Sequence, residues 1–270
     1  MSGRTRTGGV PPLVLVSAGV AAAFLVLPFL AIASEAPWST LVERYREPAV
    51  VDALGLSLAA SLAAAGISVL LGVPLAWVLA RSRFPGRSVL RGLVLLPMVL
   101  TPVVAGTGLL SAFGRRRPLG RWLEDLGVVI PFSAAGVVVA VTFVALPFMV
   151  VTVEAGLRAV DPRFEEAAAT LGAGRWLRFR RVTVPAIAPA MVAGAVLCWA
   201  RALGEFGATI TFNRNLPGET QTVPLAVFVA LESDRDAAVA LSLLLVIVAA
   251  GAVTLLAVLR DRWLPRRGSP

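Results

Sequence analysis

Long runs of apolar residues, repeated along the chain, are the feature that most restricts its fold. About 20 apolar residues form a helix that crosses a hydrocarbon core ~30 Å thick. Hydrophobic residues make up 57% of the 270 residues, which excludes a soluble globule. In lipid the backbone must satisfy its own hydrogen bonds, so each run must be helical. We therefore predict an all-α membrane protein with six transmembrane helices, at 10–33, 54–80, 89–113, 131–153, 185–211 and 237–259.

Two apolar segments differ from the other predicted spans. The first run ends in Ala31-Ile32-Ala33, which has the small-residue pattern of a signal-peptide cleavage site, so cleavage is an alternative. The run is longer than a signal core, and keeping it gives an even number of spans, so we predict a retained helix. A further apolar piece at 223–231 is too short to span, and we expect it to lie at the membrane interface.

The distribution of arginine predicts the orientation. The net charge of +9 comes from 25 arginines without any lysine. The N-terminal stretch, the 81–91 link, the 154–184 segment and the C-terminal tail hold 16 arginines, against eight in the other three connections. Positive charge is retained on the cytoplasmic side, so we expect both termini and residues 154–184 to be cytoplasmic, although the run Arg115–Arg117 opposes this trend. Because the arginines flank membrane spans, we expect no nucleic-acid partner.

Composition also restricts the chemistry. The chain has no histidine, and its single cysteine, Cys198, lies inside an apolar run. Histidine-based metal sites and Ser-His or Cys-His catalysis are thereby excluded, and we expect neither an enzyme nor a cofactor. The phosphate-binding pattern G-x-x-x-x-G-K-[ST] is also missing from the sequence, so nucleotide hydrolysis needs a separate subunit. An ion channel or proton-coupled transporter is a second hypothesis, although the sequence shows no convincing inverted repeat.

The polar stretch at about 154–184 has its own predicted structure. Pro162 and Arg163 begin a short helix, and Gly172 ends it because glycine reaches the left-handed backbone region. Residues 175–181 form a second, basic amphipathic turn, and Pro185 opens the next span. An ordered segment of this length between membrane spans should be docked against a partner.

This stretch resembles a known family. Glu166-Ala167-Ala168, three residues, Gly172, nine residues and then Val182-x-Val184-Pro185 are similar to the pattern E-A-A-x3-G-x9-I-x-L-P of ABC-type import permeases. The two valines replace isoleucine and leucine. The resemblance implies a type I ABC importer permease fold with a cytoplasmic two-helix coupling loop that fits a cleft in a separate ATP-hydrolysing subunit. It assigns the coupling role to Glu166, Ala167, Ala168, Gly172 and Pro185.

Two further motifs narrow the resemblance. Residues 200–209, A-R-A-L-G-E-F-G-A-T, resemble the fifth helix of sulfate and molybdate permeases, and T-Q-T-V-P-L-A at 220–226 is similar to molybdate permeases. The implied function is ATP-driven import of an oxyanion, above all molybdate, with sulfate, thiosulfate or tungstate as alternatives. The implied partners are two copies of the ATP-binding ABC subunit, an external oxyanion-binding protein and a second copy of this chain. The implied location is the cytoplasmic membrane of a prokaryote.

The resemblance also implies domain boundaries and candidate residues along the path of the transported anion. We expect a first helix with its flanks at 1–53, the permease domain at 54–259 and a basic cytoplasmic tail at 260–270. Candidate path residues in the fifth span are Arg201, Gly204, Glu205 and Thr209. We expect Arg201 and Glu205 on one helical face, with Arg201 about 24 Å from Pro185. Either the two form a structural ion pair, or Arg201 attracts the anion and Glu205 tempers that charge.

Overall fold

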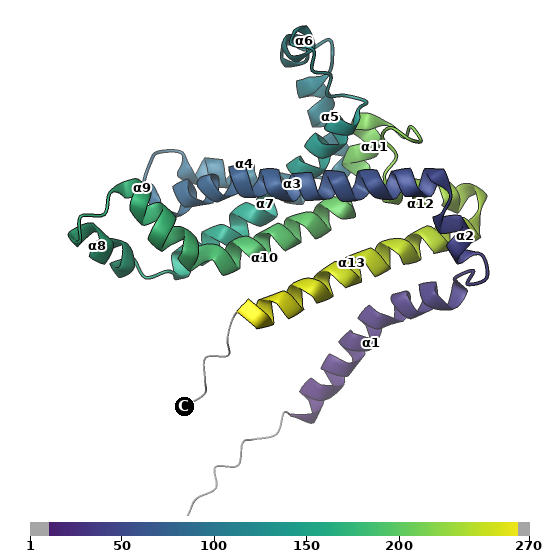
Figure 1. Ribbon diagram of the computed structural model, residues 1–270, viewed down its shortest axis with the longest axis horizontal. Coiled ribbons are helices and arrows are strands. Elements are labelled where there is room, and N and C mark those ends of the chain that lie inside the picture. Colours follow the sequence, from purple (N-terminus) through teal and green to yellow (C-terminus); the bar gives the residue numbers. More distant parts are fainter. Residues whose placement is uncertain (1–10, 264–270) are drawn as a thin grey trace, which may run out of the picture.

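The structure, a computed structural model, describes the backbone of residues 11–263 and the side chains through residue 254. Regular structure in this range is entirely helical (Figure 1). Residues 1–10 and 264–270, with Arg4, Arg6, Arg266 and Arg267, lie outside the described residues. The elements are α1 (Pro12–Glu35), α2 (Leu41–Tyr45), α3 (Pro48–Arg81), α4 (Arg87–Val99), α5 (Pro102–Phe113), α6 (Pro118–Asp125), α7 (Ala134–Ala159), α8 (Arg163–Thr170), α9 (Arg175–Arg178), the π-helical η1 (Phe179–Thr183), α10 (Val184–Leu203), α11 (Gly207–Asn213), α12 (Val223–Ser233) and α13 (Arg235–Trp263).

The predicted membrane class is confirmed. Five helices are long and apolar enough to cross a membrane, or six if the bent pair α4 and α5 counts as one span. Three of them, α3, α7 and α10, form the core of the bundle. Small side chains let their backbones approach closely, as expected for helices packed in lipid. These include Ala60, Ala64, Ala76, Ala145 and Ala202, all buried.

The third predicted span is not one helix, which corrects the expectation of a continuous span at 89–113. α4 and α5 are bent by 119° at a short break. Leu100 and Thr101 are extended, and Pro102 begins the new helix. Proline lacks a backbone N–H and disfavours helical backbone in the preceding residue, so the chain turns there. α5 then leads to α6, and the two project away from the main bundle (Figure 1).

The fifth predicted span is also broken. α10 ends at Leu203 rather than continuing to Thr211, and α11 begins at Gly207. The two breaks meet in space, because a Cβ atom added to Gly207 would lie 2.6 Å from the Cβ of Pro102. Glycine is therefore required by close approach at this position. Around this contact Ala105, Leu109, Ala140, Val144, Ala208 and Phe212 form a second buried cluster.

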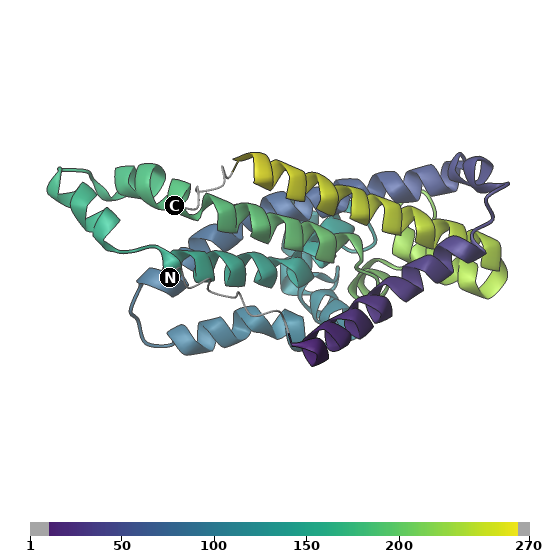
Figure 2. The same cartoon turned by 90° about the horizontal axis from the view of Figure 1, so that it is seen from below.

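Several ends of the long helices lie toward the same side of the molecule, although α1 and α13 diverge from the bundle there (Figure 1). α1 begins, and α3, α7 and α13 end, toward the end of the bundle from which α8 and α9 protrude (Figures 1 and 2). α2, the start of α3 and the α12–α13 hairpin lie at the opposite end. Successive long helices, with α4 counted among them, therefore run in opposite directions.

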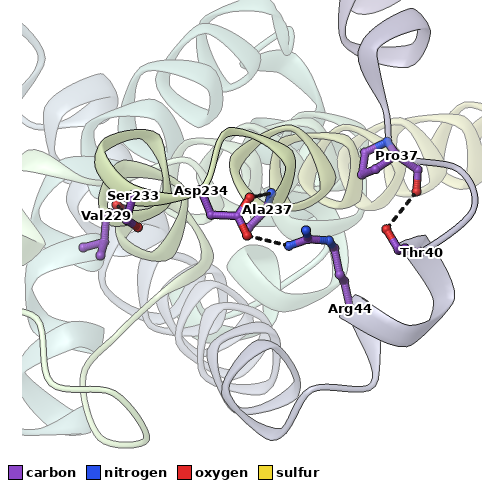
Figure 3. A network of polar contacts seen from close by, with 7 residues as sticks. All are labelled: Pro37, Thr40, Arg44, Val229, Ser233, Asp234 and Ala237. Carbon is purple, nitrogen blue, oxygen red and sulfur yellow. Dashed lines mark hydrogen bonds and ion pairs between the residues drawn. The ribbon is translucent and has the colours of Figure 1, made fainter.

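The end of the bundle opposite α8 is held by polar contacts between sequence-distant segments. The Arg44 guanidinium donates to an Asp234 oxygen at 2.9 Å, while the other oxygen accepts from the Ala237 N–H at 3.0 Å (Figure 3). These hydrogen bonds hold the pKa of Asp234 below its usual range, the one from Ala237 contributing most. The contacts join α2 to the start of α13, so this connection is ordered.

Other boundaries differ from the sequence expectation. The connections at 34–52 and 114–130, for which the sequence predicts no helix, contain α2, the first turn of α3 and α6. Proline begins both α3 and α6, where its missing N–H costs nothing. α12 has the expected length for a helix that does not span, and it packs against α13 and α3.

Candidate functional site

The segment between α7 and α10 contains the two short helices that the sequence predicts. α8 ends in a Schellman motif, in which the Gly172 N–H bonds the Ala169 carbonyl at 3.0 Å and the Ala173 N–H bonds the Ala168 carbonyl at 3.0 Å. Gly172 has φ +80°, the left-handed conformation that this stop needs. The segment is therefore an ordered, hydrogen-bonded turn between two helices.

The second short helix continues into the membrane span without a break, although α10 itself begins at Val184 with Pro185 in its first turn, where the sequence predicts the next span to open. α9, η1 and α10 run on as one helical path of 29 residues, Arg175–Leu203. Pro185 lies in the first turn of α10, just after the π-turn η1. Because proline cannot donate to the carbonyl four residues earlier, a wider π-turn accommodates it.

Two neighbouring glutamates on α8 point in different directions. The Glu165 carboxylate accepts a hydrogen bond from Thr183 Oγ1 at 2.9 Å and lies 3.5 Å from Arg81 Nη2. It ties α8 to η1 and to the end of α3. Glu166, the residue that the motif identifies, is exposed and makes no hydrogen bond among the described side chains. The sequence motif does not indicate this role of Glu165. Adjacent residues of a helix point about 100° apart, and this spacing is the sequence signal that Glu165 and Glu166 face different surroundings.

Large apolar side chains are exposed on this polar segment. Phe164 is 65% exposed, Leu171 87% and Trp176 71%. Ala167 is exposed and Ala168 is half-buried. Outside a membrane-spanning helix, a cluster of exposed apolar side chains beside a charged one indicates a protein-binding surface. Phe164, Glu166 and Leu171 are hereafter called the α8 surface.

The second candidate site is the break after α10. Glu205 is 2% exposed, and one of its oxygens lies 2.5 Å from Arg201 Nη2. Its other oxygen accepts from the Ala208 N–H at 2.8 Å, at the start of α11. Glu205 lies beyond the end of α10, so the expectation that both residues share one helical face is wrong. Gly204 is the C-cap of α10, and the Glu205 carboxylate still pairs with Arg201 one turn earlier in the chain.

The remaining path candidates, Thr209 and Gly204, differ in their exposure. The Thr209 side chain is completely buried in α11, and its hydroxyl has no hydrogen-bond partner among the described residues. Gly204 is exposed. The structure thus brings together Arg201 and Glu205, whereas Gly204 acts as the helix stop. The Arg201 side chain remains 29% exposed.

A third polar cluster escaped the sequence analysis. Glu154, 8% exposed on α7, accepts from Arg158 at 2.8 Å and forms a second ion pair with Arg91 of α4. The spacing of four between Glu154 and Arg158 was visible in the sequence, but the partner on α4 was not. This cluster ties the first half of the broken span to the core.

Comparison with solved structures shows the fold. The chain aligns with the crystal structure of a bacterial alginate ABC transporter in complex with an alginate pentasaccharide-bound periplasmic protein, with TM-score 0.73, 19% identity and coverage of 95% and 96% of the two chains. An amino acid ABC transporter crystallised with histidines gives TM-score 0.58 at 19% identity, covering 80% and 94%. The fold is that of type I ABC importer permeases.

Comparison with known sequences shows the family. Residues 68–267 match the family of binding-protein-dependent transport system inner membrane components, and the chain belongs to it. The molybdenum transport system permease protein ModB of Mycobacterium tuberculosis is 49% identical over 84% of this chain and 86% of its own. The Escherichia coli K12 protein of that name is 41% identical over 80% and 93%, and the sulfate transport system permease protein CysT of that strain is 38% identical over 81% and 80%. The chain is therefore a multi-pass inner-membrane transport component, not an enzyme.

Proposed function

We propose that this chain is the permease subunit of an ATP-driven importer that carries molybdate across the cytoplasmic membrane. The observation that carries this proposal is the 49% identity to a molybdenum permease over 84% of the chain. Sulfate is the second candidate because a sulfate permease is 38% identical over 81% of the chain. The permease domain occupies 54–259, preceded by the first helix and followed by a basic tail.

The ATP-binding subunit docks on the α8 surface. Three features support this: the exposed carboxylate of Glu166, the exposed side chains of Phe164 and Leu171, and the rigid stop at Gly172. Glu165 on the other side of α8 links this surface to α3 and η1. The described part of the chain has one such surface, so two ATP-binding subunits require two permease chains.

The second permease chain is another copy of this one. α1 buries none of its residues, and α5 exposes Val103 at 57% and Val104 at 51%. The α5–α6 arm projects from the bundle without a neighbour on its outer side (Figure 1). Both features suit a two-fold dimer in which each chain covers the apolar surfaces of the other. The anion path then lies between the copies, near the meeting point of the two helix breaks.

The substrate assignment makes a direct prediction. In vesicles containing the permease, the ATP-binding subunit and the external binding protein, molybdate is expected to stimulate ATP hydrolysis at lower concentration than sulfate. A site with fixed hydrogen-bond donors distinguishes two dianions by their size, because an anion of the wrong size leaves some of the site's donors unpaired. ATP hydrolysis measured against both anions tests this prediction. Stimulation by sulfate alone would reassign the substrate, and stimulation by neither would remove the oxyanion proposal.

The proposed orientation makes a second prediction. Cysteines replacing Ser39, Arg116 and Glu219, in a Cys198→Ser background, are expected to react with an impermeant external reagent, whereas Arg178→Cys is not. The Cys198→Ser substitution should perturb the fold little, because serine can keep the hydrogen bond that Cys198 donates to the Ala145 carbonyl. Mass-shift labelling of intact cells measures the accessibility. Labelling of Arg178→Cys alone would invert the topology, and disrupted cells provide the positive control for that position.

A further inference from the structure

A cavity of about 660 Å³ lies between the end of α3 and the short helices of the 154–184 segment. Its lining includes no residue of the α8 surface and none of the candidate residues of the anion path. One wall comes from the last turns of α3, and the other comes from α8, α9 and η1. The lining residues that matter here are Pro74, Trp77, Val78, Arg175, Trp176, Arg178 and Phe179.

Three of the side chains that line this cavity are aromatic. The Phe179 ring meets Trp77 edge-on, with centroids 6.1 Å apart, and it stacks on Trp176 at 5.7 Å. The three rings join α3 to α9 and η1 through an apolar surface. With Pro74 and Val78, they offer a surface along which a hydrocarbon chain can lie.

The charge around the cavity is positive and unpaired. Neither Arg175 nor Arg178 forms an ion pair among the described residues. The Nε atom of Arg178 is buried and has no hydrogen-bond partner within the described part of the chain. The one acidic lining residue, Glu165, is engaged by Thr183 and Arg81. Two guanidinium groups are thus available to an anion.

The depth of the cavity matches a lipid headgroup. α3 has 34 residues, a length of about 51 Å, whereas the hydrocarbon core is ~30 Å thick. With α3 centred in the membrane, Pro74 to Val78 lie where hydrocarbon gives way to headgroups. Tryptophan is enriched at this level, and basic pockets there are suited to anionic headgroups.

We infer that this cavity binds an anionic phospholipid. Its phosphate lies between Arg175 and Arg178, and one acyl chain follows Pro74, Trp77 and Val78. The lipid then bridges α3 and α9, the helix that continues into α10. It joins the membrane to the segment on which we place the ATP-binding subunit. The inference rests on the cavity and its charges, and it uses the proposed function only to name the leaflet.

The test measures phospholipid retained by the purified full-length permease. Native mass spectrometry with added phosphatidylglycerol or phosphatidylcholine is expected to show tighter binding of phosphatidylglycerol. Each arginine near an anionic lipid contributes about fivefold in affinity, so the double variant Arg175→Gln, Arg178→Gln is expected to lose about 25-fold. The matched control is Arg116→Gln, Arg117→Gln, exposed arginines outside the cavity, which should bind as the wild type does.

Each alternative has its own outcome. Equal binding of the two lipids, or an equal loss in the control variant, overturns the inference. Displacement of phosphatidylglycerol by excess inorganic phosphate would indicate a free-anion site instead. If the Arg175→Gln, Arg178→Gln permease retains lipid but loses the ATP-binding subunit on co-purification, the cavity is a protein contact. That result would leave the proposed transport function intact.

A second measurement works without removing the arginines. Phosphatidylglycerol with brominated acyl chains quenches nearby tryptophans, so it should quench the wild type more than a Trp176→Phe variant in the same vesicles. Brominated phosphatidylcholine at the same fraction should show a smaller difference. An equal difference for both lipids would mean that Trp176 meets bulk lipid, which also overturns the inference.

Discussion

Replacing Gly172 by valine is expected to abolish coupled transport while the permease remains in the membrane. The backbone of Gly172 is at φ +80°, which costs an L-residue about 1–2 kcal/mol and a β-branched one more. Open space surrounds the position, since an added Cβ would meet nothing within 4 Å. The defect must therefore come from the backbone, through loss of the Schellman stop that sets the direction of α8.

The chain offers a matched control two residues away. Gly174 also has nothing within 4 Å of an added Cβ, but its φ is −64°, which any residue adopts. Gly174→Val should therefore keep transport, and Gly172→Asn should lose less than Gly172→Val because asparagine tolerates left-handed backbone. ATP-driven uptake in vesicles, with expression and insertion checked in parallel, measures the effect. Equal uptake by the two valine variants would remove the proposed role of this turn.

The parts of the fold that sequence predicts well are those with a local physical cause. Apolar length locates α1, α3, α7, α10 and α13, because each span must bury its backbone in hydrocarbon. The stop at Gly172 was predictable because a helix end needs a left-handed residue and glycine supplies it. The motif containing Glu166 predicts that this segment docks on the ATP-binding subunit, and that role stays a prediction.

The helix breaks were harder to locate because apolar composition hides them. The run 89–113 stays apolar through Pro102, and hydropathy does not distinguish a kinked span from two helices bent by 119°. Close packing decides the outcome: α5 turns out of line and packs on α11, where Gly207 admits Pro102. Likewise, nothing local separates Glu165 from Glu166. Only the folded positions of Arg81 and Thr183 show which carboxylate faces inward.

The break after α10 changes what the ion pair there is expected to do. Glu205 is buried and also caps α11 through the Ala208 N–H. Removing Arg201 alone leaves an unpaired buried charge, a change that costs about 3–5 kcal/mol. Arg201→Met is therefore expected to fold poorly, whatever its part in transport. The single variant cannot separate a structural role from a role toward the anion.

The double variant Arg201→Met, Glu205→Gln separates the structural role of Arg201 from its role toward the anion. Glutamine keeps an oxygen for the Ala208 N–H and removes the unpaired charge, so folding should recover. We expect transport to stay about 10- to 150-fold below wild type, because a charged hydrogen bond to the anion is worth about 1.5–3 kcal/mol. The matched control is Arg235→Met, Glu35→Gln, a pair 2.8 Å apart with both side chains more than half exposed, which should transport normally. Vesicle uptake of molybdate, at equal ATP-binding subunit content, measures both variants. Full uptake by the Arg201→Met, Glu205→Gln permease would show that Arg201 serves only to neutralise Glu205.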